Sequence, residues 1–366
     1  MVRQLAAGLV QSGIDTHVAT TDDNGPDTVP ARYGEPTVQD GVTYWFFPRQ
    51  LRFYTASWPL ARWLSHRVAD FDVVHIHALF SFAALPASFF AARRNVPYIV
   101  RPLGTLNHWG MAHRRPWLKS LSFRLIERRI LSHAALVHYT SAQEQREAET
   151  LGVYGESVVI PIAVADSSVE GHPGAFLARH PQLRGRRVVL FLSRLDPKKG
   201  LDLLLNSFVE VRRRFPTASL VIAGDGPAEF VDTVKSYAEK LGVASDVTWT
   251  GFLSGDNKAG AFAAADVFAL PSYSENFGIA VAEAMAAGVP VVVSDQVAVH
   301  RDIAAAEAGL VVRCDAAHLS QALLQLLGDG DLRKSMGQRG KALVAQQYSQ
   351  TATTRHVIET YNRIAH

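Results

Sequence analysis

The chain has a single cysteine, Cys314, and no apolar run long enough to cross a bilayer. One thiol cannot form an internal disulfide and has no neighbours with zinc-ligand spacing, so the sequence favours a reducing compartment, the cytosol. A membrane-spanning helix needs about 18 to 20 consecutive apolar residues. The first residues, MVRQLAAGLVQSG, predict an amphipathic helix rather than a signal peptide. We therefore expect a cytoplasmic protein that is neither secreted nor inserted in a membrane.

Net charge is also scarce, because 37 Lys and Arg against 34 Asp and Glu give only +3. This balance does not favour a nucleic-acid partner. The basic residues nevertheless gather, since residues 101–130 hold seven of them and only one acidic residue, Glu127. Residues 108–129 of this stretch also carry aromatic and aliphatic side chains. They predict either peripheral contact with an anionic membrane, on the inner face of the plasma membrane, or a helix whose charges are merely solvated.

With 366 residues the chain exceeds what one core usually organises, so two domains are expected. Short β-branched apolar runs alternate with helical patterns, which predicts parallel sheets in an α/β fold. We expect an N-terminal domain over residues 1–163, a linker rich in Gly, Pro and Ser over 164–186, and a second domain over 187–347. Residues 348–366 predict a helix that crosses back to the N-terminal domain.

The first domain lacks a recognisable first strand. A doubly wound sheet usually begins with a strand and a Gly-rich turn, whereas this chain begins in a helix followed by residues 16–20, which read as the second strand. The first strand is central in the common strand order, so without it the neighbouring strands would have unpaired backbone groups. Either residues upstream or another segment would fill the slot.

The second domain carries cations after its first predicted strand, in the motif RLDPKKG. Arg194 and Lys199 would lie at the carboxyl edge of the sheet, where such sheets bind ligands. An arginine fork and a lysine charge together can neutralise a diphosphate without a metal. Taken alone, however, such a pair is more often a solvated basic loop.

Two further motifs follow later strands. In IAGDGP, Gly224 and Gly226 flank Asp225. The two glycines either let a ligand approach the backbone or simply form a turn between strand and helix.

The stretch ENFGIAVAEA places two carboxylates, Glu275 and Glu283, eight positions apart. If a helix begins near Gly278, Glu283 lies about 8 Å along it, comparable to the span of a diphosphate. Backbone N–H groups of Asn276, Phe277 and Gly278 would hold phosphate oxygens. Glu275 would accept hydrogen bonds from sugar hydroxyls, and Glu283 from the ribose. In the alternative interpretation, Glu275 is only a negative charge at the N-terminus of the helix, and Glu283 is a residue on the exposed face of that helix.

In this order and spacing, SRLDPKKG, IAGDGP and ENFGIAVAEAMAAGVPVVVSD resemble the C-terminal half of the retaining glycosyltransferases of the GT-B fold, family 4. Glu275 and Glu283 meet the E-x7-E pattern of that family. The resemblance covers residues 187–366 with high specificity and 1–162 more loosely. It implies two Rossmann-like domains facing a cleft, and sugar transfer from a nucleoside diphosphate with the anomeric configuration kept. No cofactor or metal is implied.

The resemblance also implies residue roles in the second domain. Arg194 and Lys199 would bind the diphosphate, Glu283 the ribose, and Glu275 with the amides after it the transferred sugar. The neighbourhood of Leu253 would hold the base.

Family members commonly carry a histidine after the fourth strand, where this sequence has Leu103. His77, at the end of DVVHIH, is the candidate replacement, with His108 a weaker one. A histidine at a strand end more often only satisfies local hydrogen bonds. Gly104, Asn107 and His108 are the acceptor-side candidates.

UDP-hexose is the default donor, and a saccharide or lipid-linked saccharide in cell-surface polysaccharide synthesis the expected acceptor. The missing first strand and Leu103 favour a rival, a non-catalytic subunit that binds nucleotide-sugar. A GT-B epimerase would need more acid/base residues in the cleft, and a phosphorylase a cofactor lysine that the sequence does not show. A dinucleotide oxidoreductase is disfavoured because no G-x-G-x-x-G follows a strand.

Overall fold

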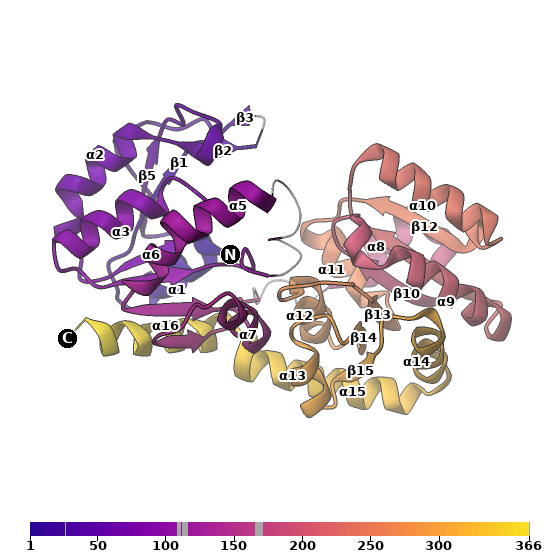
Figure 1. Cartoon of the computed structure of the whole chain (residues 1–366). Helices are drawn as coiled ribbons and strands as arrows, with labels where there is room; N and C mark the ends of the chain where they lie inside the picture. Colours follow the sequence, from indigo (N-terminus) through magenta and orange to yellow (C-terminus); the bar gives the residue numbers. More distant parts are fainter. Residues whose placement is uncertain (26, 108–110, 112–115, 165–170, 366) are drawn as a thin grey trace. The chain divides into compact units, whose positions relative to one another are not determined.

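The structure, a computed structural model, describes residues 1–25, 27–107, 111, 116–164 and 171–365. These residues form two compact units, Met1–Ala163 with Gln350–His366, and Val164–Ser349 (Figure 1). We call them the first and second unit. Within the described ranges, no helix is both long enough and apolar enough to span a membrane.

The second unit is built on a 6-stranded parallel sheet with the order β12-β11-β10-β13-β14-β15. The strands are β10 (Arg187–Leu192), β11 (Ala218–Ala223), β12 (Val247–Gly251), β13 (Val267–Leu270), β14 (Val291–Ser294) and β15 (Gly309–Val312). Strand order reverses between β10 and β13, and ligands of such sheets bind at the carboxyl ends of the strands beside this point.

Helices cover both faces of this sheet, so β11 and β14 are buried at every position. The helices are α8 (Pro173–Arg179), α9 (Leu201–Arg214), α10 (Ala228–Lys240), α11 (Gly255–Ala263), α12 (Ile279–Ala286), α13 (His300–Ala305), α14 (Ala316–Gly328) and α15 (Gly330–Leu343). Shorter turns are η5 (Pro181–Leu183), η6 (Pro197–Lys199), η7 (Ala244–Asp246) and the π-helix η8 (Val344–Tyr348).

Residues 164–186, expected to be an irregular linker, include α8 and η5 and belong to the second unit. Phe176 of α8 is fully buried, and α8 packs on α11, where Gly260 lies against the Phe176 side chain. One buried phenylalanine among Gly, Pro and Ser leaves no helical period in the sequence, which is why this helix was not predicted.

The first unit has its strands in separate sheets. A 3-stranded sheet has the order β1-β5-β4 and a 4-stranded sheet the order β6-β7-β8-β9, with a small ribbon β2-β3. The strands are β1 (His17–Thr21), β2 (Asp23–Asn24), β3 (Asp27–Thr28), β4 (Pro36–Gln39), β5 (Val42–Phe47), β6 (Val74–His77), β7 (Tyr98–Arg101), β8 (Leu136–Tyr139) and β9 (Ser157–Val159).

In the described part of the chain, β1 pairs only with β5, and β6 only with β7. No described strand lies between β1 and β6, so the predicted gap is present. We call it the strand slot.

The helices of the first unit are α1 (Val2–Gln11), α2 (Trp58–Arg67), α3 (Ala84–Arg93), α5 (Pro116–Ser122), the π-helix η3 (Phe123–Glu127), α6 (Arg128–Ser132), α7 (Ala142–Thr150) and α16 (Gln350–Ile364). Two 3-10 turns are η1 (Phe53–Thr55) and η2 (Val68–Asp70).

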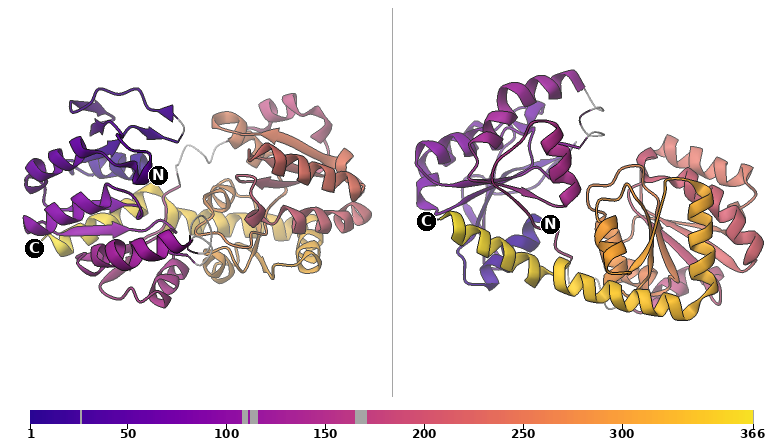
Figure 2. Two further views of the ribbon diagram at one scale, coloured as in Figure 1. Left: turned by 45° about the horizontal axis from the view of Figure 1, so that its top comes forward. Right: turned by 60° about the horizontal axis from the view of Figure 1, so that its bottom comes forward.

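The predicted amphipathic helix at residues 2–11 is present as α1, and it packs on α16 (Figure 2). Leu5 and Leu9 of α1 form a core cluster with Ile160 and with Val357 of α16. A Cβ at Gly8 would overlap the Thr354 hydroxyl, so the glycine lets the two helices approach closely. Residues from both ends of the chain therefore share one core.

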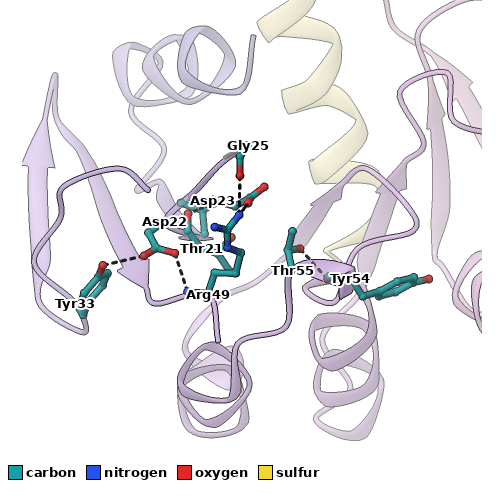
Figure 3. A network of polar contacts seen from close by, with 9 residues as sticks. Thr21, Asp22, Asp23, Gly25, Tyr33, Arg49, Tyr54 and Thr55 are labelled. Atoms are coloured by element: carbon teal, nitrogen blue, oxygen red, sulfur yellow. Dashed lines mark hydrogen bonds and ion pairs between the residues drawn. The ribbon is translucent and has the colours of Figure 1, made fainter. Parts of the chain in front are cut away.

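A polar network holds the loops that follow β1 and β5 (Figure 3). The buried Asp22 carboxylate accepts hydrogen bonds from the Arg49 backbone N–H at 2.7 Å and from the Tyr33 hydroxyl at 2.8 Å. The Arg49 guanidinium pairs with Asp23 and donates to the Gly25 carbonyl at 3.0 Å. These charges satisfy one another, which indicates a structural role.

Candidate active site

Lys199 lies at the carboxyl end of β10, in η6, and its position is fixed by the glycine that follows. Gly200 has φ 69° and begins α9, and a Cβ there would overlap the Pro271 carbonyl oxygen just after β13. The Tyr273 N–H also donates to the Lys198 carbonyl at 2.8 Å. The Lys199 side chain is consequently buried between the ends of β10 and β13, at the point where strand order reverses.

Glu275 faces Lys199 across this point, and the two form an ion pair. The backbone of Glu275 is held on both sides, because its N–H donates to the Gln296 carbonyl at 3.1 Å and its carbonyl accepts from the Ala298 N–H at 3.0 Å. Its side chain is only 15% exposed. The structure therefore brings two predicted site residues into contact and supplies each with an opposite charge.

Further cations surround this pair. The Arg194 side chain is 63% exposed, with its guanidinium 4.0 Å from the Asp196 carboxylate. Burial and the neighbouring positive charges of Lys199 and Arg194 lower the pKa of Lys198, while Glu275 and Asp196 oppose this shift. Positive charge is thus concentrated after β10, with one buried and one solvent-exposed cation among the predicted residues.

Glu283 forms a second ion pair, which the sequence did not predict. It lies on α12, where most neighbouring residues are buried, and it shares the more open side of the helix with the exposed Ile279, four positions earlier. Lys258 of α11 reaches it, with Nζ 2.7 Å from Glu283 Oε1. Lys258 belongs to no motif, and only the three-dimensional contact identifies it.

The loop between Glu275 and α12 contains the predicted phosphate-binding amides. Gly278 has φ 84°, and its carbonyl accepts from the Val281 N–H at 2.9 Å, which starts the helix. The Phe277 ring is buried edge-on against Tyr348, with centroids 5.4 Å apart. Any ligand contact of Phe277 would therefore use its backbone, and the half-buried Asn276 precedes it in the same loop.

Gly224 and Gly226 allow two loops to lie together. A Cβ on Gly224 would overlap the Ser193 carbonyl oxygen, and one on Gly226 the Leu195 carbonyl oxygen. The Leu195 N–H donates to the Asp225 carbonyl at 2.8 Å. Close packing of the loops after β10 and β11 is sufficient to explain both glycines. The Asp225 side chain is exposed, and its contact with a ligand stays a prediction.

Leu253, the predicted base neighbour, is half-buried between β12 and α11. It lies five residues before Lys258 and next to the exposed Phe252. The same segment thus presents an apolar side chain and the partner of Glu283.

In the first unit, His77 ends β6 with its ring stacked on His75, at a centroid distance of 4.3 Å. Burial, with the nearby positive charge of Arg101, lowers the pKa of His77 to about 3. Its Nδ1 atom is buried without a hydrogen-bond partner among the described residues. His77 is therefore neutral at physiological pH and retains an unused polar atom.

His77 belongs to a buried polar cluster that the sequence did not reveal. His75 Nδ1 lies 2.9 Å from the Tyr361 hydroxyl, and His138 Nδ1 lies 3.3 Å from His75 Nε2. Arg101, at the end of β7, is buried, and burial lowers its pKa to about 10. The sequence signal that could have identified Arg101 as a buried polar residue is its charge at the end of the otherwise apolar run YIVR.

The loop after β7 contains the acceptor-side candidates. The buried Glu144 carboxylate accepts from the Gly104 N–H, and also from the N–H and hydroxyl of Thr140, both at 2.7 Å. Leu103 has φ 58°, and the Asn107 carbonyl accepts from the Met111 N–H at 2.9 Å. His108 lies outside the described residues. Glu144, not predicted from sequence, thus anchors this loop.

Among the residues that the structure describes, no group of three or more His, Cys, Asp or Glu side chains is arranged to hold a metal ion.

Comparison with known proteins bears on the whole chain. Residues 177–343 match the family described as Glycosyl transferases group 1, and residues 1–163 match the Glycosyl transferase 4-like domain. A GDP-mannose-dependent alpha-(1-6)-phosphatidylinositol monomannoside mannosyltransferase of Mycobacterium tuberculosis is 31% identical over 292 residues, 77% of this chain and 74% of the relative. The chain belongs to the group 1, family 4 glycosyltransferases.

Other similarities agree with this membership. A phosphatidyl-myo-inositol mannosyltransferase of Mycobacterium leprae is 32% identical over 313 residues, 83% of this chain and 76% of the relative. The solved structure of sucrose-phosphate synthase from Thermosynechococcus elongatus superposes with a TM-score of 0.78 at 20% identity, covering 99% of this chain and 92% of that one. The predicted GT-B fold of this glycosyltransferase, with parallel sheets in two α/β units, is confirmed.

Proposed function

We propose that this glycosyltransferase binds a nucleoside diphosphate sugar through its second unit and transfers the sugar, with retention and without a metal, to a saccharide or lipid-linked saccharide. The observation that carries the proposal is the pair of lysine–glutamate contacts, Lys199–Glu275 and Lys258–Glu283, at the carboxyl side of the parallel sheet. Each predicted donor-binding glutamate is already held in place by a cation.

In this proposal Lys199 and Arg194 receive the diphosphate. Lys199 is fixed by Gly200 and Glu275, so its charge is preorganised where negative charge grows as the sugar leaves. The exposed Arg194 guanidinium offers a fork to phosphate oxygens. Glu275 accepts from sugar hydroxyls and Glu283 from the ribose. His77 of the first unit is neutral, and its buried Nδ1 has no hydrogen-bond partner among the described residues; it is the proposed replacement for the histidine that family members commonly carry.

The names of the relatives support GDP-mannose as donor, because the Mycobacterium tuberculosis protein is called GDP-mannose-dependent. The UDP-hexose expected from the sequence becomes the second candidate. Names of relatives that refer to phosphatidylinositol likewise support a lipid-linked acceptor over a free saccharide. We propose that transfer takes place at the cytoplasmic side of the membrane, in the synthesis of cell-surface glycans.

A thermal-shift screen with GDP, UDP, GDP-mannose and UDP-glucose tests the donor. A ligand that binds only the folded state at about 100 times its Kd stabilises it by about 2.7 kcal/mol. We expect GDP and GDP-mannose to raise the melting temperature more than the uridine compounds do. Their effect should be smaller in the Glu283→Ala variant than in the parent. If no nucleoside diphosphate raises it, the donor site is wrongly assigned.

Transfer assays with the donor so identified then separate an enzyme from a silent nucleotide-sugar-binding subunit. We expect product formation that persists in EDTA, with the anomeric configuration of the donor retained. Binding without transfer to any lipid or saccharide acceptor would instead support the subunit.

A further inference from the structure

Tyr348 is a fully buried tyrosine at the end of the π-helix η8, beside the loop that contains the predicted phosphate-binding amides. We call that loop, residues 275–278, the donor loop. The Phe277 ring is 2% exposed and meets the Tyr348 ring at a centroid distance of 5.4 Å and an interplanar angle of 75°. Edge-to-face contacts of this kind are favourable beyond the apolar area that they bury. The Tyr348 ring therefore supports the donor loop from inside the second unit.

The hydroxyl of Tyr348 fixes where that ring lies. It donates to the Asp302 carboxylate of α13 at 2.7 Å, a charge-assisted hydrogen bond that is stronger than a neutral one. Burial and the negative charge of Asp302 raise the pKa of Tyr348 above its usual range, so the hydroxyl keeps its proton and stays a donor. Asp302 itself is exposed, so substituting it opens no cavity in the core.

Helix α13 is also attached to the beginning of the donor loop. Residues 296–298, which lead into α13, pair with both the N–H and the carbonyl of Glu275. Through Asp302 and Tyr348, the same helix supports Phe277, two residues further on. These contacts close a ring, in which α13 holds the donor loop at two points through two independent routes.

The backbone of Tyr348 is held separately from its side chain. Its carbonyl accepts from the Val164 N–H at 2.8 Å, and the Ser349 N–H donates to the Val344 carbonyl at 2.7 Å, the five-residue spacing of a π-helix. Single π-helical turns are frequent at functional sites. Because these bonds use only main-chain atoms, a variant that lacks the Tyr348 hydroxyl keeps them, and the side chain can be tested alone.

We propose that Tyr348 is a positioning residue for donor binding, and that the Asp302 carboxylate holds it in the orientation that the donor loop needs. The inference rests on the proposed function, in which the N–H groups of Asn276, Phe277 and Gly278 bind phosphate oxygens. Such groups bind an anion well only when they are oriented before it arrives, since otherwise binding energy is spent on ordering the loop. Tyr348 is fully buried, so it acts through Phe277 and touches no ligand.

The competing interpretation gives Tyr348 a structural role alone, because a buried tyrosine hydroxyl usually finds a hydrogen-bond partner. In that case, losing the hydroxyl would lower the stability of the second unit but leave donor binding by the folded protein unchanged. A positioning role instead changes both donor binding and the protection of the donor-loop amides while the protein is fully folded. The two interpretations therefore differ in quantities that can be measured.

Calorimetry on the full chain with GDP, UDP and inorganic pyrophosphate tests the proposal. We expect Tyr348→Phe to bind pyrophosphate and the preferred nucleoside diphosphate about fivefold more weakly than the parent, since the loop amides contact the phosphate groups that these ligands share. Asp302→Ala should show the same loss, and Asp302→Asn, which keeps an acceptor oxygen, should recover most of it. The double variant Tyr348→Phe/Asp302→Ala should lose no more than either single variant, since both remove one bond.

The matched controls are Tyr237→Phe and Asp331→Ala. The Tyr237 hydroxyl accepts from the Asn206 side chain at 2.7 Å, on a part of the second unit that includes α10. Asp331 is an exposed acidic residue in the first turn of α15, as Asp302 is in the first turn of α13. Both controls should bind the ligands as the parent does, and melting curves check that every variant is folded at the temperature of the titration.

Hydrogen exchange gives a second readout that needs no ligand. In Tyr348→Phe, peptides that cover the donor loop should exchange faster than in the parent, whereas peptides that cover β11 should exchange at the same rate. Tyr237→Phe should leave both sets of peptides unchanged.

Unchanged affinity in Tyr348→Phe, with a parent chain that binds the ligands, overturns the positioning role. So does an equal loss of affinity in Tyr237→Phe. A parent chain that binds none of the ligands contradicts the proposed function instead. Exchange of the donor loop then decides the positioning role by itself, and an exchange rate that is the same in Tyr348→Phe as in the parent overturns it.

Discussion

Lys199 and Glu275 are both largely removed from solvent, so each depends on the other for stability as well as for ligand binding. Breaking a buried pair by removing one partner costs about 3 to 5 kcal/mol, because an uncompensated charge is left behind, whereas replacing both partners is often neutral. A loss of activity in a Lys199 variant therefore needs a stability measurement beside it.

We expect Lys199→Met to lower the free energy of unfolding by about 3 kcal/mol. The double variant Lys199→Met/Glu275→Gln should recover most of that loss. Both should bind the free nucleoside diphosphate at least about tenfold more weakly, since a charge-assisted contact is removed. Urea titration and calorimetry measure the two quantities, with Lys240→Met as control. Unchanged diphosphate affinity in both variants would remove Lys199 from the site.

Glu283 is predicted to contact the ribose rather than the phosphates. Glu283→Gln should therefore weaken binding of the nucleoside diphosphate by about tenfold, the loss expected for a charge-assisted hydrogen bond. Binding of inorganic pyrophosphate should stay the same. Calorimetry with both ligands measures this, and Glu239→Gln on the exposed side of α10 is the control. Equal losses for the two ligands would contradict the ribose role.

The buried histidines give the first unit a predictable pH dependence. Burial holds the pKa values of His75, His77 and His138 well below their usual range. The unfolded chain therefore binds more protons below about pH 6.5, and stability present above that pH is lost as the pH falls. Between pH 6.5 and 5.5 the loss is about 1 kcal/mol for each histidine.

Denaturant titrations at pH 7.5 and 5.5 measure this loss. His77→Asn should show a smaller loss between the two pH values than the parent, and the exposed His133→Asn the same loss as the parent. Stability that does not change over this range would contradict the neutral, buried state of the cluster.

Among the elements, β1 and β6 are sheet-edge strands of the first unit, because in the described residues β1 pairs only with β5 and β6 only with β7. Val74 and Ala78 donate to carbonyls of Pro97 and Arg101, so by the alternation of a strand the N–H groups of His75 and His77 point into the strand slot. No backbone partner is seen for these two among the described residues.

We expect the slot-facing amides of β1 and β6 to exchange with solvent far faster than those of β11, whose residues are buried between two paired neighbours. Residue-resolved hydrogen exchange measures this, and the amides of β1 that face β5 are the internal control. Protection of the His75 and His77 amides comparable to that of β11 would show that another part of the chain occupies the slot in solution.

Local patterns were sufficient to predict most elements, including the gap, because β-branched runs and helical periods alternate regularly here. They also predicted that Lys199, Glu275 and Glu283 belong to the second unit's site, since the carboxyl ends of parallel strands meet at one edge. Lys258 was missed because its partner Glu283 lies 25 residues away in sequence, and Glu144 because its contact with Gly104 spans 40 residues; periodicity registers neither contact.

At the scale of the whole molecule, each unit has its own core, and matched substitutions should report on each separately. Val357 of α16 and Val293 of β14 are both buried. Removing two buried methyl groups by Val→Ala costs about 2 kcal/mol. In differential scanning calorimetry we expect Val357→Ala to lower only the first unit's transition, and Val293→Ala only the second's. A donor nucleotide should raise the temperature of one transition, and that transition is then assigned to the second unit. Equal shifts of a single shared transition would show that the units unfold together.

The contact between α1 and α16 also bears on biosynthesis. Leu5 and Leu9 are made before the second unit, yet Val357, which covers them, is made more than three hundred residues later. The intervening Val164–Ser349 segment can fold on the ribosome in the meantime, since all of its sheet lies within it. The α1 surface must wait, uncovered, until residues 350–364 leave the exit tunnel, which makes it the natural place for a chaperone to hold the nascent chain.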